Sequence, residues 1–195
     1  MCGRYYIDTE DSSEQLKQII EEINHTQANT EAHALMKSGE IFPTNIVPVV
    51  GQDGPPTLRK WGYAGYGNRV INARSETAFT KPMFRKSLLE RRCLIPASGY
   101  YEWKRNASGS KSKQKYALYR AEKPLFMAGI WREEHSEKLP VFVILTREAA
   151  PGIAEIHDRM PLILPQEACD EWLRRGADAG RVMQRSIDDL QYCAV

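Results

Sequence analysis

The sequence has few cysteines, no long hydrophobic run and almost no net charge, and each of these absences excludes a class of protein. Its four cysteines are scattered through 195 residues without a CxxC pair, so neither a zinc site nor a disulfide framework is expected. No apolar run approaches the ~20 residues that cross a bilayer, and the N-terminus lacks the basic-then-apolar profile of a signal peptide. We therefore expect a cytoplasmic protein that needs no membrane, metal or cofactor.

The charges are unevenly distributed although the net charge is only +2. Residues 81–115 contain ten lysines or arginines and two acidic residues, whereas residues 8–40 contain eight acidic residues and two lysines. A basic segment in a near-neutral protein favours a localised surface for polyanions. A solvated basic hairpin tip at 109–115 would explain the same charges.

The spacing of hydrophobic residues predicts one domain over residues 1–195. Ser12 and Gln15 match a capping box, so a helix is expected to begin at Ser12. Further helices are expected at 82–90, within 147–156 and from Pro165 to Gly176, and the polar stretch 24–45 is expected to be mostly loop. Strands are expected at 3–7, 46–51, 57–63, within 66–76, and at 93–104, 114–121, 124–132, 138–146 and 160–164. Because strands and helices do not alternate, we predict an α+β fold with an antiparallel β-barrel-like core and peripheral helices.

Cys2 directly follows the initiator methionine, and a small second residue permits removal of Met1. The mature chain would then carry a thiol and an α-amine on one residue, with ordinary pKa values of about 8.5 and about 7.7–8.0. The amine of such a 1,2-aminothiol forms a Schiff base with an aldehyde, and the thiolate then closes a thiazolidine ring. Position alone favours the alternative, an incidental cysteine or a small apolar residue that enters the first strand.

Glu102 and His157 are candidates for proton transfer. Glu102 lies among aromatic residues in an expected strand, where desolvation would raise its pKa; the alternative is an outward-facing glutamate paired with a lysine. His157 lies at a helix-to-strand junction, where Asp158 or Arg159 could orient it; the alternative is a histidine that caps the preceding helix. His25, His33 and His135 lie in polar stretches and receive no role.

Asn72 and Arg74 are two residues apart and would share one face of a strand. An asparagine there could orient an amine or a carbonyl, and an arginine could hold a phosphate. A turn asparagine beside a surface arginine would fit the same letters.

These residues fall in five ordered blocks: Met1–Arg4, Trp61–Gly62, Ile71–Thr77, Arg92–Trp103 and Ile156–Pro161. Together the blocks resemble the SOS response-associated peptidase (SRAP) family across nearly the whole chain. The resemblance implies a compact mixed α/β domain around a β-barrel-like core. Two departures are a short segment after Gly62 and an end at Val195, where relatives usually continue.

The resemblance also implies a function. SRAP proteins bind single-stranded DNA that contains an abasic site and shield the lesion as a covalent thiazolidine crosslink during the DNA damage response. By this likeness Cys2 would form the crosslink after Met1 removal, Asn72 would position its amine, Glu102 would transfer protons, and His157 would assist sugar ring-opening and reversal. Autocatalytic peptidase action on Met1 and a weak abasic-site lyase activity are implied as well.

The resemblance further implies which residues contact DNA. Arg4 and Arg74 would hold phosphates, and Thr146 would line the pocket. Five residues would pack on bases or wedge the strand: Trp61, Trp103, Pro43, Met83 and Phe84. We expect single-stranded abasic DNA to be the partner of a monomer.

Two rival functions start from the same residues. Met-Cys-Gly also begins glutamine amidotransferases, in which a processed N-terminal cysteine is the nucleophile of an amide hydrolase; a glutaminase assay distinguishes this alternative. A non-catalytic single-stranded DNA-binding module would bind DNA equally well with or without an abasic site. A metal hydrolase is disfavoured, because the four histidines and four cysteines lack ligand spacing.

Overall fold

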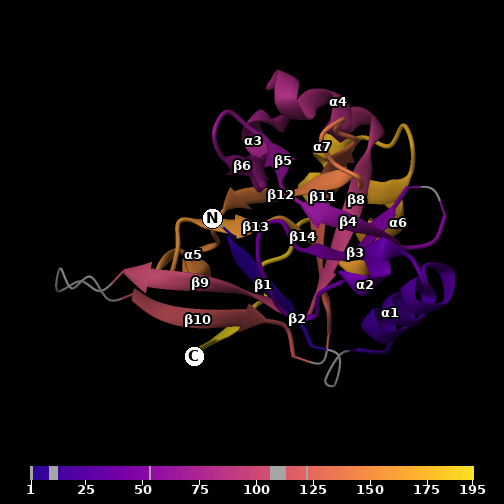
Figure 1. The fold of residues 1–195 in the computed structure, drawn as a ribbon. Helices are drawn as coiled ribbons and strands as arrows, with labels where there is room; N and C mark the ends of the chain where they lie inside the picture. Colours follow the sequence, from indigo (N-terminus) through magenta and orange to yellow (C-terminus); the bar gives the residue numbers. More distant parts are fainter. Residues whose placement is uncertain (1, 9–12, 53, 106–112, 122) are drawn as a thin grey trace.

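The computed structural model describes residues 2–8, 13–52, 54–105, 113–121 and 123–195 (Figure 1). The strands are β1 (Arg4–Ile7), β2 (Gly39–Ile41), β3 (Ile46–Gly51), β4 (Thr57–Trp61), β5 (Tyr63–Ala64), β6 (Arg69–Val70), β7 (Asn72–Arg74), β8 (Arg92–Ala97), β9 (Gly99–Arg105), β10 (Lys113–Tyr119), β11 (Leu125–Arg132), β12 (Val141–Glu148), β13 (Arg159–Pro161), β14 (Ile163–Leu164) and β15 (Gln191–Ala194). The helices are α1 (Glu14–Thr26), α2 (Glu31–Ala34), α3 (Ser75–Ala78), α4 (Pro82–Glu90), α5 (Pro151–Ala154), α6 (Gln166–Leu173) and α7 (Ala179–Met183).

Five strands close into a barrel. They pair in the cyclic order β12, β4, β3, β8, β11 and back to β12. The predicted barrel-like core is therefore confirmed, with one difference: β12 is parallel to β4 and, further along, to β7. The same strand pairs with β11 and then with β13 on its other edge, so β12 brings β7 and β13 together at one end of the barrel.

A second sheet packs beside the barrel in the order β15-β10-β9-β1-β2. Its strands are antiparallel, with Arg4 opposite Tyr101 and Tyr116 opposite Glu102. In Figure 1, β9 and β10 extend away from the barrel and α5 lies close to β9. This register places Cys2, two residues before Arg4, toward the part of β9 that carries Glu102.

The helices follow local signals, with small shifts from the expected boundaries. α1 is capped by Ser13, whose Oγ accepts from the Leu16 N–H at 3.4 Å, and Leu16 and Ile23 on one side of the helix are buried; the expected cap, Ser12, lies outside the described residues. α4 begins at Pro82 as predicted. The helix predicted from Pro165 to Gly176 is shorter, spanning Gln166–Leu173.

Other features also differ from the expectations. The stretch 24–45 contains α2 and β2 rather than loop alone, and α7 and β15 were not predicted. The segment 93–104 is not one strand: it changes sheets at Ser98, whose N–H donates to the Tyr6 carbonyl and whose Oγ accepts from the Asp8 N–H. Gly62 separates β4 from β5 with a φ of 110°, a backbone conformation that favours glycine.

Arg92 ties two helix ends to the barrel. Arg92 is 1% exposed, and its guanidinium donates to the carbonyls of Trp172 at 2.6 Å, Arg174 at 2.5 Å and Leu88 at 3.3 Å. These carbonyls lie at the C-terminal ends of α6 and α4, where helical hydrogen bonds are missing and a positive charge is favourable.

We expect Arg92→Met to lower the free energy of unfolding by about 3–5 kcal/mol, because three carbonyls lose their buried donors. Urea unfolding measures this change. Lys138→Ala is the control, because the Lys138 side chain is 83% exposed, and we expect no shift in its midpoint. If the Arg92→Met protein were as stable as the unaltered one, the hydrogen bonds of Arg92 to the two helix ends would not stabilise the fold.

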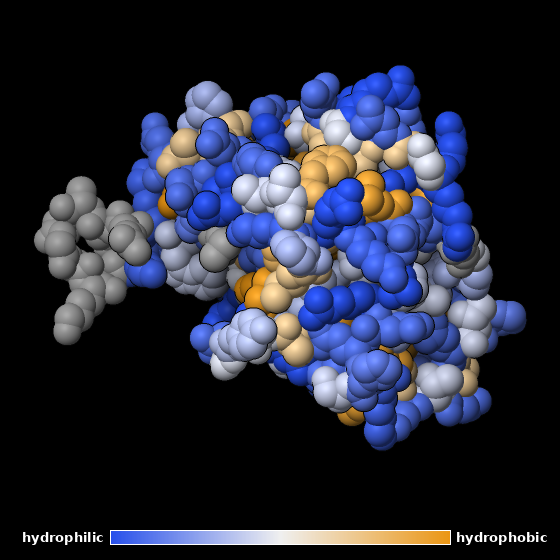
Figure 2. Space-filling model, turned by 90° about the horizontal axis from the view of Figure 1, so that it is seen from above, coloured by the Kyte–Doolittle hydropathy of each residue, from blue (hydrophilic) through white to orange (hydrophobic). Residues whose placement is uncertain are grey.

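No helix formed by the described residues is long and apolar enough to cross a bilayer. Seen from above, the molecule is mostly hydrophilic, and its hydrophobic residues form small separate patches (Figure 2).

Candidate active site

The candidate site begins at Cys2, which is buried near Glu102. Its side chain has no exposed surface, and its Sγ donates to the Arg4 carbonyl with an Sγ···O distance of 3.7 Å. Burial, and then the negative charge of Glu102, raise the pKa of the thiol well above its ordinary value. The thiol therefore stays protonated at neutral pH unless a neighbouring base takes its proton.

Asn72 fixes the backbone of this cysteine. β7 lies along β12 with Asn72 opposite Ile144, and Asn72 Nδ2 donates to the Cys2 carbonyl at 2.8 Å. Among the described residues, the buried Oδ1 of the same amide has no hydrogen-bond partner. Asn72 therefore contacts Cys2 through Nδ2 and still has Oδ1 available to accept a hydrogen bond.

Glu102 and His157 form the second part of the site. Glu102 is 3% exposed, and burial raises the pKa of its carboxyl above 4.5, as its aromatic sequence context predicted. His157 Nε2 lies 4.0 Å from Glu102 Oε2. A buried carboxyl beside an imidazole can move protons near neutral pH.

The backbone after α5 orients His157. Its Nδ1 accepts from the Arg159 N–H at 3.0 Å and lies 2.8 Å from the exposed carboxylate of Asp158. Nδ1 is therefore fixed by a backbone donor and a carboxylate, which leaves Nε2 as the ring nitrogen that faces Glu102.

Arg159 links three elements around this histidine. Its guanidinium donates to both carboxylate oxygens of Glu76 at 2.7 and 2.9 Å, and to the Thr146 carbonyl at 2.8 Å. Because it joins β13, α3 and β12, Arg159 holds the backbone N–H that orients His157. In the sequence, Arg159 follows His157 and Asp158 directly, and this proximity was the signal that it could orient His157.

A cavity of about 470 Å³ opens onto Glu102 and His157, and its other lining residues are Gly3, Arg4, Trp103 and Lys113. A second cavity of about 370 Å³ shares Trp103 and His157 with the first. The lining of the first cavity therefore combines two cations, Arg4 and Lys113, with the Trp103 indole and the buried Glu102 carboxyl. A cation-and-aromatic lining of this kind suits a nucleic-acid strand.

Comparison with known proteins identifies the family. A profile of the SOS response associated peptidase (SRAP) family matches residues 1–194. The chain belongs to the SRAP family. The matched residues include all five sequence blocks and all five strands of the barrel.

Several named proteins and a solved structure are similar to this chain. It is 32% identical over 192 residues to the abasic site processing protein YoqW of Bacillus subtilis, covering 89% of this chain and 80% of that protein. It is 42% identical over 121 residues to the abasic site processing protein YedK of Escherichia coli, covering 59% of this chain and 53% of that protein. A crystal structure of a Bacteroides thetaiotaomicron protein has the same fold, with a TM-score of 0.76 at 20% identity over 100% of this chain and 92% of the other.

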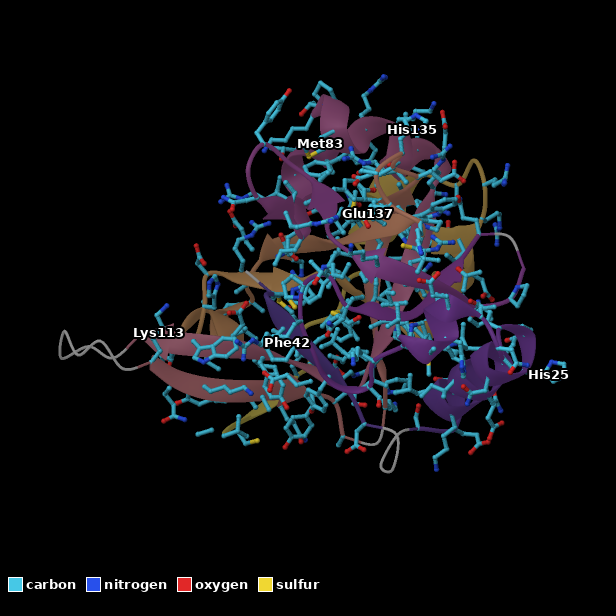
Figure 3. The ribbon with its side chains drawn as sticks, viewed as in Figure 1. His25, Phe42, Met83, Lys113, His135 and Glu137 are labelled. Atoms are coloured by element: carbon cyan, nitrogen blue, oxygen red, sulfur yellow. The ribbon has the colours of Figure 1, made fainter. Side chains whose placement is uncertain are left out.

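The structure brings only some of the DNA contacts implied by the SRAP resemblance to this cavity. Arg4 and Trp103 line it, and Arg74 is exposed at the end of β7. Pro43 is half-buried beside the exposed Phe42. Met83 is half-buried on α4, well away from Phe42 and Lys113 (Figure 3). The two regions therefore lie apart on the molecule.

Three implied contacts are not available to DNA in this conformation, because the side chains are in the core. Trp61 and Thr146 have no exposed surface and Phe84 is 5% exposed. Trp61 instead donates from Nε1 to the Ile71 carbonyl at 3.0 Å, directly before Asn72. Its role is to position β7, and the expectation that it stacks on a base is wrong for this structure.

Within the described ranges, no group of three or more histidine, cysteine or acidic side chains is arranged to hold a metal ion. His25 and His135 lie at the periphery of the molecule (Figure 3). Sequence reasoning missed Glu40, Phe42, Lys113 and Lys115 near the cavity; the two lysines were visible only as part of the basic segment.

Proposed function

We propose that this protein captures abasic sites in single-stranded DNA as a thiazolidine crosslink through Cys2, once Met1 has been removed. The observation that carries the proposal is the fixed position of Cys2: Asn72 holds its carbonyl at 2.8 Å, and its thiol lies close enough to the buried Glu102 to feel that charge, with the half-buried His157 4.0 Å from the Glu102 carboxylate. The relatives YoqW and YedK are named abasic site processing proteins, which supports the same substrate.

The chemistry balances with these groups alone. Removal of Met1 leaves a primary amine on Cys2. The amine nitrogen attacks the aldehyde carbon of the ring-opened sugar, and loss of one water gives the imine. The Cys2 Sγ then adds to the imine carbon while its proton moves to the nitrogen, so that aminothiol and aldehyde yield thiazolidine and water.

Each neighbouring residue supplies a step that the burial of Cys2 makes necessary. A buried thiol with a raised pKa needs a base at hand, and Glu102 is that base. The unpartnered Oδ1 of Asn72 can accept from the freed amine and orient it toward the aldehyde. His157 exchanges protons with Glu102 and with the ring oxygen of the sugar, which opens the sugar and assists reversal. The same cavity would perform the autocatalytic removal of Met1 and, from the imine, a weak β-elimination of the strand.

A denaturing-gel assay tests the proposal. Intact mass first establishes that Met1 is absent. The protein is then mixed with a single-stranded oligonucleotide that carries one abasic site, and with the same oligonucleotide without it. We expect a heat-stable shifted band only with the abasic strand. No band would reject the crosslink, and glutaminase activity or equal affinity for both strands would favour the rival functions.

A further inference from the structure

The outer face of the five-stranded sheet is built from aromatic and cationic side chains. Alternation along β1, β9 and β10 puts Tyr5, Tyr100, Glu102 and Leu118 toward the barrel, where all are buried. We define the outer face by the residues that point the other way and are half-buried: Arg4, Tyr6, Tyr101, Trp103 and Lys115. Arg4 and Trp103 also line the site cavity, so the outer face is continuous with it.

The cations of this face lie on its aromatic rings. The Arg4 guanidinium is 4.3 Å from the centre of the Phe42 ring and 5.2 Å from that of Trp103. The Lys115 ammonium is 3.6 Å from the centre of the Tyr101 ring. These contacts hold both cations in place at the edge of the cavity.

One carboxylate oxygen joins the two cations. Glu40 Oε1 accepts from Arg4 Nη1 at 3.1 Å and from Lys115 Nζ at 3.0 Å. Burial would raise the pKa of Glu40, but the hydrogen bonds from Lys115 and Arg4 outweigh it and lower the pKa below 4.5, so this group is charged at neutral pH. Two donors that converge on one anionic oxygen are the arrangement that binds a phosphate oxygen.

Resting on the proposed function, we propose that single-stranded DNA leaving the site cavity continues across the outer face, where Arg4 and Lys115 share one phosphate and displace Glu40. The two cations and one carboxylate leave this cluster with a net positive charge, which complements a polyanion. The rings of Tyr6 and Tyr101 stack at 5.0 Å beside it and extend the aromatic surface along which bases can lie. Glu40 is then a built-in competitor that limits affinity for the strand.

The test measures reversible binding, separately from crosslinking. The probe is a single strand with a non-reactive tetrahydrofuran abasic analogue, used short or extended by about six nucleotides on one side or the other. We expect Glu40→Gln to tighten binding about three- to tenfold for one of the two extended strands. Lys115→Ala and Tyr101→Ala should weaken binding of that same strand, and Lys115→Ala should make the slope of log affinity against log salt shallower by about 0.7.

Two control variants separate this site from general effects. Glu31→Gln changes the net charge equally and frees Lys138 from an exposed ion pair at 2.9 Å. Tyr192→Ala removes a 47% exposed tyrosine from β15; its partner Leu118 faces the barrel, so Tyr192 points away from the outer face. Neither change should alter the affinity for any of the three strands.

Several outcomes would overturn the proposal. If Glu40→Gln and Glu31→Gln changed the affinity equally, the change in net charge alone would explain the effect. Equal effects on the short strand and on both extended strands would mean that no strand crosses this face. A gain in affinity cannot come from misfolding, so Glu40→Gln remains decisive even if Tyr101→Ala unfolds. If the unaltered protein binds as expected but forms no crosslink with reactive abasic DNA, the proposed function fails and the surface stands.

Discussion

The Cys2→Ala variant is expected to form no denaturation-resistant complex with abasic single-stranded DNA, because it lacks the sulfur that closes the ring. Its amine can still form an imine, which water reverses unless a reductant traps it. We therefore expect the stable band to disappear in the variant and to return after borohydride treatment. The unaltered protein should give its band without borohydride. A denaturing gel with and without borohydride measures both results.

The matched control is Cys193→Ala. Cys193 is the exposed cysteine of the described structure, on the edge strand β15, and its thiol is the more accessible to a reagent in solution. If accessibility governed the reaction, this variant would lose the band and Cys2→Ala would keep it. That pattern would contradict the assignment of the buried aminothiol.

The Glu102→Gln variant is expected to crosslink about 10²–10⁴-fold more slowly, because glutamine cannot carry the proton that leaves the thiol. Its affinity for the non-reactive analogue should fall by much less than its rate. Single-turnover time courses and anisotropy provide the two numbers. Glu155→Gln, a change at a 74% exposed carboxylate, should leave the rate within about twofold, and equal losses of rate and affinity in Glu102→Gln would make its role structural.

Stability against pH gives an independent test of the same carboxyl. Burial raises the pKa of Glu102 in the folded chain above its ordinary value of 4.5, so the folded state keeps this proton to higher pH than the unfolded state. The contribution of Glu102 to stability therefore falls as pH rises from about 4.5 through the folded pKa. Glu102→Gln removes this loss, and urea unfolding should show a neutral-pH stability no lower than that of the unaltered protein.

Local patterns predicted the parts of the fold that depend on local chemistry. The 82–90 helix begins at Pro82 as expected, and the apolar runs at 46–51 and 124–132 are strands. Barrel closure through the parallel β12–β4 pair could not be predicted, because strands far apart in sequence choose partners by packing rather than by composition. Two-residue strands such as β5 and β14 are too short to show a period.

The candidate site divides along the same line. The burial of Glu102 followed from its aromatic neighbours and is confirmed. The exposure of Trp61 was predicted wrongly, because the sequence Trp-Gly does not show whether the indole faces solvent or, as here, the core. The Glu40 bridge was out of reach, since it joins three strands whose register no single segment encodes.

The place of β1 in its sheet has a practical consequence. β1 lies between β9 and β2, and the residues just before it, Cys2 and Gly3, run into the site itself. An affinity tag at this end would leave the Cys2 nitrogen in a peptide bond, so that it could not react as an amine. Val195, by contrast, is 59% exposed beside the edge strand β15, so purification handles, fluorophores and surface tethers belong at that end.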